Sequence, residues 1–196
     1  MIKLNETMKK LNILIIALLF AGAVNAQNWT LDKAHSKLGF GVTHLLVSEV
    51  EGNYNSFDAK ITSSKDDFSD AIIELSADVA TVNTNNEGRD KHLKSPDFFD
   101  ADKFNALTFK SKSLTKVEGK KYKMVGDLTL HGVTRTVTLD VTFNGTAVHP
   151  YSKKTIAGFK VSGSIKRSDF GVGGGTPTAV VSDEVAITAN TEFVKG

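Results

Sequence analysis

The chain has 196 residues, a formal net charge of +2 and no cysteine. This charge balance gives no electrostatic argument for a nucleic-acid-binding surface. The lack of cysteine excludes disulfide cross-links and a thiolate that acts as nucleophile or metal ligand. A chain of this length has room for one domain with a sizeable apolar core.

The first 26 residues have the layout of a secretory signal peptide. Lys9 and Lys10 precede an apolar stretch over residues 11–24, and small residues stand at −3 and −1 of a cleavage point between Ala26 and Gln27. An uncleaved anchor is the alternative, although about 18 or more apolar residues are usually needed to cross a bilayer. We therefore predict an exported protein whose mature domain spans residues 27–196.

The mature domain is expected to be neutral and to contain no integral membrane segment. The first 26 residues hold three lysines and one glutamate, so their removal leaves 170 residues with no net charge. No later stretch is long and apolar enough to read as a membrane-spanning helix.

Apolar and polar residues alternate along most of the mature chain, a pattern typical of strands with one buried face. The links between these segments are mostly short and carry turn pairs such as Glu118-Gly119 and Asn144-Gly145, which favours antiparallel hairpins. Closing the sheet into a barrel would remove its exposed edges. We predict an all-β antiparallel barrel of eight or nine strands, with strands around residues 36–43, 48–54, 57–62, 71–79, 107–110, 121–130, 136–143, 157–166 and 185–193.

Two segments interrupt the alternation. Residues 83–105 contain helical features, with Ser95-Pro96 fitting a helix N-cap and first turn, so we expect a helical insertion around residues 86–104. Phe98 and Phe99 lie in this insertion, and a connection of this length is often functional. Residues 171–182 hold three consecutive glycines and Pro177 and read as a flexible loop.

Motifs for enzymatic chemistry are lacking. The chain has no Gly-x-Ser-x-Gly motif, and the glycine-rich stretch after Phe170 lacks the Gly-Lys-Ser/Thr ending of a phosphate-binding loop. The five histidines show no metal-ligand spacing and no accompanying carboxylate cluster, so no metal site is predicted. These histidines are His35, His44, His92, His131 and His149.

Residues 89–93 (RDKHL) have two interpretations. Arg89 and Asp90 could form an ion pair that caps a short helix, or the segment could form a polar collar at a barrel mouth that binds the head of a ligand. Arginine suits the second role because its planar guanidinium presents several donors to phosphate or carbonyl oxygens.

The inward-facing apolar residues define a candidate tunnel. An eight-stranded barrel is near the size at which side chains fill it or leave space for one ligand, and the pattern alone does not separate the two cases. The residues predicted to line the tunnel are Leu38, Phe40, Val42, Ile73, Leu75, Phe98, Phe99, Phe109, Leu139, Val141, Phe143, Phe159, Val161 and Ile187.

Six sequence blocks resemble the YceI-like family of polyisoprenoid-binding proteins. They are residues 29–36 (WTLDKAHS), 40–45 (FGVTHL), 52–57 (GNYNSF), 89–101 (RDKHLKSPDFFDA), 126–135 (GDLTLHGVTR) and 165–171 (IKRSDFG), which together cover nearly all of the mature chain in order. Tyr54 departs from the phenylalanine that is common at its position.

The resemblance implies a lipocalin-like barrel, usually exported to the periplasm or secreted beyond it, that encloses an isoprenoid or quinone-like lipid and is not an enzyme. Carried over by position, it makes His35, Ser36, Arg89, Asp90, His92 and Arg167 candidates for the polar mouth, with an Arg167–Asp169 ion pair as the structural alternative for Arg167. We expect non-enzymatic binding, transport or storage of such a lipid. The alternative is a filled-barrel envelope protein that acts through its surface, and a homodimer is one possible assembly.

Overall fold

The computed structural model describes residues 26–196 of the chain. The predicted signal peptide therefore lies outside the described residues except for Ala26. Within the described part, no helix has the length and apolarity that crossing a bilayer would require.

Eleven strands form a single antiparallel sheet. They are β1 (Gln27–Leu31), β2 (Lys37–His44), β3 (Ser48–Tyr54), β4 (Phe57–Ser63), β5 (Ile72–Asp78), β6 (Val82–Asn83), β7 (Ala106–Glu118), β8 (Lys121–Leu130), β9 (Val133–Val148), β10 (Thr155–Lys166) and β11 (Val181–Lys195). Helix α2 (Glu87–Lys94) and the short 3-10 turns η1 (Lys33–His35), η2 (Val79–Thr81) and η3 (Arg167–Phe170) complete the described elements. The short strands β1 and β6 were not predicted.

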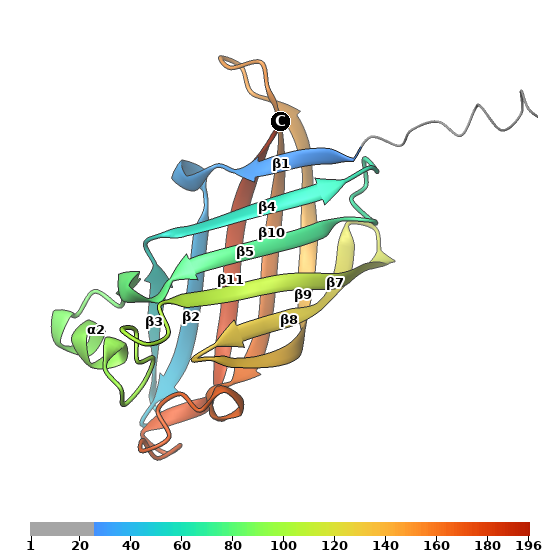
Figure 1. The fold of residues 1–196 in the computed structure, drawn as a ribbon. Coiled ribbons are helices and arrows are strands. Elements are labelled where there is room, and N and C mark those ends of the chain that lie inside the picture. The colour runs from blue at the N-terminus through green and yellow to red at the C-terminus, as the bar shows by residue number, and fades with distance from the viewer. Residues whose placement is uncertain (1–25) are drawn as a thin grey trace, which may run out of the picture.

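Eight of these strands close into a ring, in the order β1-β4-β5-β7-β8-β9-β10-β11 (Figure 1). The ring closes because β1 pairs with β4 on one side and with the last residues of β11 on the other. Further along, β11 pairs instead with β2, and β2, β3 and β6 extend the wall beyond the closed ring. The prediction of an all-β antiparallel barrel of eight or nine strands is confirmed, and the closed ring has eight.

The alternation of the sequence is reproduced as alternation of burial. In β8, Tyr122, Met124, Gly126, Leu128 and Leu130 are buried, whereas the positions that alternate with them are exposed or half-buried. Successive side chains of a strand point to opposite faces, so one set fills the interior and the other meets water. The same pattern in β4 buries Phe57, Ala59 and Ile61.

The connection between β6 and β7 carries helix α2 at one end of the barrel (Figure 1). The Asn86 side chain caps α2 by accepting a hydrogen bond from the Arg89 amide at 2.9 Å. The prediction that Ser95-Pro96 starts a helix is wrong, because Ser95 ends α2 and its hydroxyl donates to the His92 carbonyl at 2.7 Å. Turns follow over residues 95–103, and they bury Phe98 and Phe99 against the barrel.

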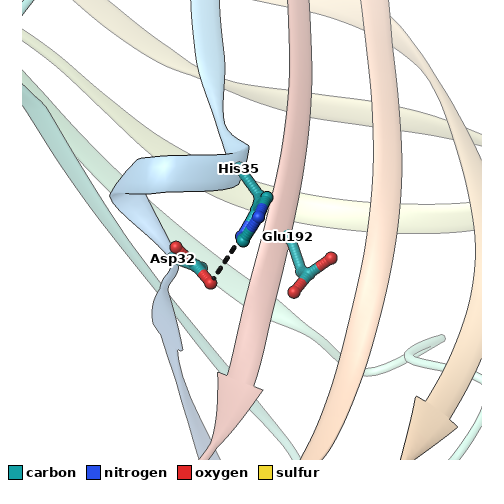
Figure 2. Close-up of side chains that lie close together, drawn as sticks. All are labelled: Asp32, His35 and Glu192. Atoms are coloured by element: carbon teal, nitrogen blue, oxygen red, sulfur yellow. Dashed lines mark hydrogen bonds and ion pairs between the residues drawn. The ribbon is translucent and has the colours of Figure 1, made fainter. Parts of the chain in front are cut away.

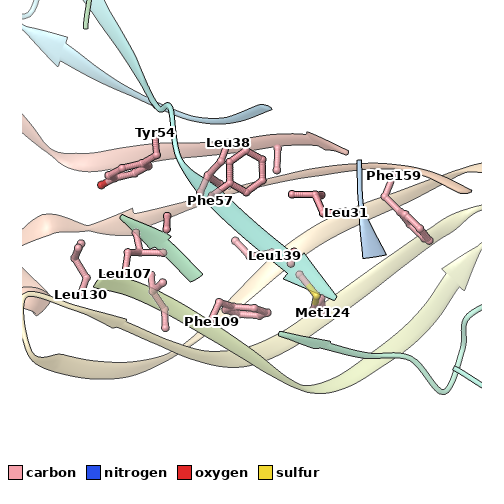
Figure 3. Packing of buried hydrophobic residues seen from close by; sticks show 14 of the residues in the cluster. Leu31, Leu38, Tyr54, Phe57, Leu107, Phe109, Met124, Leu130, Leu139 and Phe159 are labelled. Carbon is pink, nitrogen blue, oxygen red and sulfur yellow. The ribbon is translucent and has the colours of Figure 1, made fainter. Parts of the chain in front are cut away.

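The opposite end of the barrel is packed with aromatic rings. Phe68, from the turn between β4 and β5, is 1% exposed, and its ring centroid lies 5.1 Å from those of Trp29, Phe143 and Phe159. Phe159 also lies 6.0 Å from Phe193. Figure 3 shows the two regions of the interior, with Phe159 and Met124 toward one end and Tyr54, Leu107 and Leu130 toward the other. The first of these ends is therefore a solid floor.

Candidate functional site

An apolar cavity of about 400 Å³ lies inside the barrel, on the α2 side of the aromatic floor. Ten of the fourteen predicted tunnel residues line it. They are Leu38, Phe40, Val42, Leu75, Phe98, Phe99, Phe109, Leu139, Val161 and Ile187. The barrel is thus hollow over part of its length and filled over the rest.

The other four predicted tunnel residues, Ile73, Val141, Phe143 and Phe159, do not line the cavity. Phe143 and Phe159 stack on each other at 5.2 Å and belong to the aromatic floor. Ile73, Val141 and Phe159 each lie one inward position nearer the floor than a cavity-lining residue of the same strand, namely Leu75, Leu139 and Val161. The strand pattern placed them on the inward face correctly, but it does not say at which residue the hollow ends.

The cavity has further lining residues that were not among the predicted tunnel residues. Leu107, Leu128, Leu130, Ile165 and Val185 occupy inward positions of strands whose alternation had been recognised, so the same pattern could have found them. The lining also includes Tyr54, Thr84, Val172, Thr176, Val180 and Val181, most of which come from loops and short strands that carry no periodic signal.

Two glycines make room for large rings in the cavity wall. A Cβ atom on Gly52 would collide with the ring of Phe40, and a Cβ on Gly126 would collide with the ring of Phe109 and lie 2.6 Å from the Lys110 carbonyl oxygen. Each ring therefore lies over a glycine of the neighbouring strand. This packing keeps both rings against the wall and leaves the space beside them open.

Tyr54 packs in the same wall between two other aromatic residues. Its ring centroid lies 5.9 Å from Phe40 and 6.4 Å from Phe99. Burial raises the pKa of the Tyr54 hydroxyl, so the side chain is neutral at physiological pH. The substitution of tyrosine for phenylalanine at this position adds a polar atom to an otherwise apolar region of the lining.

Arg89 and His92 of α2 reach the cavity, whereas Asp90 does not line it. The Arg89 guanidinium donates to the Thr84 hydroxyl at 2.7 Å and to the Thr84 carbonyl at 2.9 Å. Asp90 accepts from the Thr84 amide at 2.8 Å and from its hydroxyl at 2.6 Å. Arg89 and Asp90 are therefore linked through Thr84, which replaces the direct ion pair that was one of the two interpretations.

Arg167 also lines the cavity, and it is only 6% exposed. Its guanidinium donates to five backbone carbonyls of the segment that follows it: Ser182 at 3.1 Å, Val172 at 3.1 Å, Gly173 at 2.6 Å, Thr176 at 2.7 Å and Val181 at 3.1 Å. The alternative of an ion pair with Asp169 is wrong, since no such contact is present among the described residues. Arg167 organises residues 171–182 into one wall of the cavity.

His35 and Ser36 do not line the cavity, contrary to prediction. The Ser36 hydroxyl accepts from the Glu192 amide at 3.0 Å and thereby links the chain between η1 and β2 to β11. His35 is exposed, and its Nδ1 lies 2.9 Å from Asp32 Oδ2 (Figure 2). This hydrogen bond, together with the charges of Asp32 and Glu192, raises the pKa of His35.

The expectation that no carboxylates gather around a histidine is also wrong for His35. Asp32, His35 and Glu192 each offer a ligand atom within 4.8 Å of the others, although Glu192 comes from the opposite end of the sequence (Figure 2). The two carboxylates favour the protonated form of His35, which agrees with the raised direction of its pKa.

The comparisons with known proteins agree with this geometry. A family model of the YceI-like domain matches residues 29–193. A UPF0312 protein of Staphylococcus aureus is 38% identical over 170 residues, which cover 85% of this chain and 96% of that protein. The chain belongs to the YceI-like family.

Solved structures of YceI-like and related proteins share the barrel. Burkholderia cenocepacia BcnA superposes with a TM-score of 0.74 at 27% identity, over 83% of this chain and 98% of that one. The Campylobacter jejuni YCEI protein superposes with a TM-score of 0.70 at 37% identity, over 83% of this chain and 95% of that one. A domain from Saccharophagus degradans described as polyisoprenoid-binding superposes with a TM-score of 0.65, over 86% of this chain and 98% of that one. Its sequence identity is 17%, so this likeness supports a shared fold alone.

Proposed function

We propose that this YceI-like protein binds a long-chain isoprenoid, or a similar amphiphilic lipid such as a quinone, with its hydrocarbon chain in the cavity. The observation that carries the proposal is a cavity of about 400 Å³ lined almost entirely by apolar side chains and closed at one end by aromatic rings. Ligand pockets typically have volumes of about 300–1,000 Å³. Membership of the YceI-like family supports the choice of ligand class, and the Saccharophagus degradans domain with the same fold is described as polyisoprenoid-binding.

Binding is driven by removal of the hydrocarbon from water, at about 25 cal/mol per Å² of apolar surface. The polar head of the lipid would stay near Arg89 and His92, the polar side chains of α2 that reach the cavity. These groups would orient the head and add selectivity, whereas the apolar lining would supply most of the affinity. The role is therefore binding, transport or storage without chemical conversion of the cargo.

We further propose that the protein acts in the periplasm or outside the cell. The support for this proposal is the predicted signal peptide with cleavage near Ala26-Gln27. N-terminal sequencing of the protein recovered from the cell envelope tests it, and a mature N-terminus at Gln27 is expected.

A substitution that fills the cavity tests the lipid proposal directly. Val161→Phe adds a ring to the cavity lining, whereas Val117→Phe adds the same ring at a position that is 62% exposed on the outside. The delipidated proteins would be titrated with a polyprenol and examined by native mass spectrometry, with thermal melting to confirm that each is folded. We expect wild type and V117F to bind one lipid per chain and folded V161F to lose most of this binding. Equal binding by V161F, or no binding by wild type, would refute the proposal.

The role of Arg89 is tested with a pair of ligands. Arg89→Gln should weaken binding of a polyprenyl phosphate more than binding of squalene, because only the phosphate accepts hydrogen bonds from the guanidinium. Equal losses for the two ligands would show that Arg89 does not contact the head group.

A further inference from the structure

The turn between β2 and β3 exposes three consecutive apolar side chains. Leu45 is 52% exposed, Leu46 is 73% exposed and Val47 is 84% exposed. Val180, from the loop before β11, lies beside them, because its carbonyl accepts a hydrogen bond from the Leu45 amide at 2.9 Å, and it is 37% exposed. We call these four residues the apolar tip.

The backbone of this turn is in a conformation that leucine adopts with difficulty at positions 45 and 46. Leu45 has a φ of 51° and Leu46 a φ of 59°, in the left-handed region that glycine, asparagine and aspartate adopt most readily. Leucine at both positions carries a conformational cost, and the exposed side chains recover little packing in return. Neither local conformation nor the protein core therefore explains why the turn is apolar.

The apolar tip lies at the open end of the cavity. His44 and Val50, which flank the turn on β2 and β3, both line the cavity, and so does Val180 itself. The turn and the loop over residues 171–180 project from the same end of the barrel, and the β7–β8 hairpin lies at the other end (Figure 1). A surface in contact with the tip would face the mouth of the cavity directly.

The chemistry of the tip selects its partner. Residues 45–48 (LLVS) contain no charged side chain, and Glu49 follows with an exposed carboxylate. This composition gives no attraction for an anionic surface, so the driving force is burial of apolar side chains alone. A bilayer of neutral phospholipid satisfies that requirement, and a bilayer is also where a long-chain lipid cargo resides.

We propose that the apolar tip inserts into the surface of a phospholipid bilayer and holds the cavity mouth against it while a lipid passes between membrane and barrel. The proposal rests on the proposed lipid-binding function, because a bilayer is the phase with which such a carrier exchanges cargo. Binding is expected to be reversible, and the contribution of residues 45–48 is expected to be nearly independent of salt because these residues carry no charge.

Tryptophan fluorescence tests insertion without any cargo. Trp29 is the single tryptophan of the chain, so Trp29→Phe provides a silent background. In that background, Leu46→Trp reports on the tip and Val117→Trp reports on the exposed β7–β8 hairpin at the opposite end. With phosphatidylcholine vesicles we expect a blue shift of emission for L46W and none for V117W. No shift for L46W, or an equal shift for both, would overturn the proposal.

A charged tip separates membrane docking from cargo binding. Leu46→Asp with Val47→Asp removes the exposed apolar surface, and aspartate tolerates the left-handed backbone at position 46; Val117→Asp is the matched control. We expect the double variant to lose about tenfold or more in vesicle binding and in polyprenol uptake from vesicles, while binding of polyprenol delivered by cyclodextrin stays unchanged. If wild type does not bind polyprenol delivered by cyclodextrin, the proposed lipid-binding function is wrong, whereas the vesicle-binding result for the tip is unaffected.

Undiminished uptake from vesicles by the double variant would overturn the role of the tip. Light scattering gives a second decisive outcome. If wild type is a dimer that L46D/V47D dissociates, and vesicles shift no L46W emission, then the tip serves a second copy of the chain and the membrane proposal is wrong.

Discussion

Removing the guanidinium of Arg167 should cause the largest loss of stability among single substitutions at the cavity. This group is buried and donates to five backbone carbonyls of residues 172–182. A hydrogen bond to a charged group contributes about 1.5–3 kcal/mol, but burying the cation costs several kcal/mol and offsets much of the sum. We expect a net loss of about 3–5 kcal/mol for Arg167→Met, because each buried carbonyl left without a donor costs about 1–3 kcal/mol and removal of the cation's own burial cost offsets part of that sum.

The loss is large enough to measure in two ways. For a domain of this size, 1 kcal/mol corresponds to about 2–4 °C in Tm, so R167M should melt about 6–20 °C below wild type. Arg167→Lys keeps the charge but offers fewer donors from a single point, so its loss should be intermediate. Hydrogen exchange should show faster exchange confined mainly to residues 171–182, because these carbonyls lose their shared donor.

Arg135 provides the control for this experiment. Its side chain is exposed and makes one hydrogen bond, to the Thr134 carbonyl at 3.2 Å. Arg135→Met should therefore change stability by no more than about 0.5 kcal/mol. A loss below about 1 kcal/mol for R167M, with exchange in residues 171–182 as slow as in wild type, would refute the assigned role of Arg167.

Three further predictions concern packing and ionisation. Gly126→Ala places a methyl group against the Phe109 ring and the Lys110 carbonyl of the neighbouring strand, and it should lower the free energy of unfolding in urea by about 1–3 kcal/mol. Gly41→Ala should cost almost nothing, because the nearest atom to its new methyl group would lie 4.0 Å away. Equal losses for the two variants would contradict the packing argument. Hydrogen bonds from two lysines lower the pKa of Glu74 from 4.5 to about 2, so its stabilising effect is full above about pH 4.5 and is lost as the pH falls toward 2. Glu74→Gln should flatten the fall of stability in that window, and an unchanged slope would count against the ion pairs. The hydrogen bond with Asp32 raises the pKa of His35 above 6.5. The stabilising effect of this hydrogen bond is therefore present below pH 6.5 and disappears as the pH rises through the raised pKa. In an NMR titration Asp32→Asn should bring the His35 pKa back toward 6.5, and an unshifted curve would exclude Asp32 as the cause.

The sequence by itself determined the barrel and the inward face of its principal strands. Side chains alternate across a strand whatever its surroundings, so the apolar positions of β2, β4, β8 and β10 identify the interior without coordinates. The irregular segment around α2 was also recognisable, because alternation stops there. Its polar residues Arg89 and His92 line the cavity, and their contact with a ligand stays a prediction.

Only the tertiary structure decided how much of that interior is hollow. Phe68 enters the barrel from a turn, with a φ of 59°, and completes the floor that removes Phe143 and Phe159 from the cavity. Arg167 meets its five carbonyls only because residues 172–182 fold back around its guanidinium, and His35 meets Glu192 only because the barrel brings the two ends of the domain together. The alternation of apolar and polar residues predicts which face of a strand a side chain lies on. Whether that side chain meets a cavity or a filled core depends on loops and glycines, which show no alternation in the sequence.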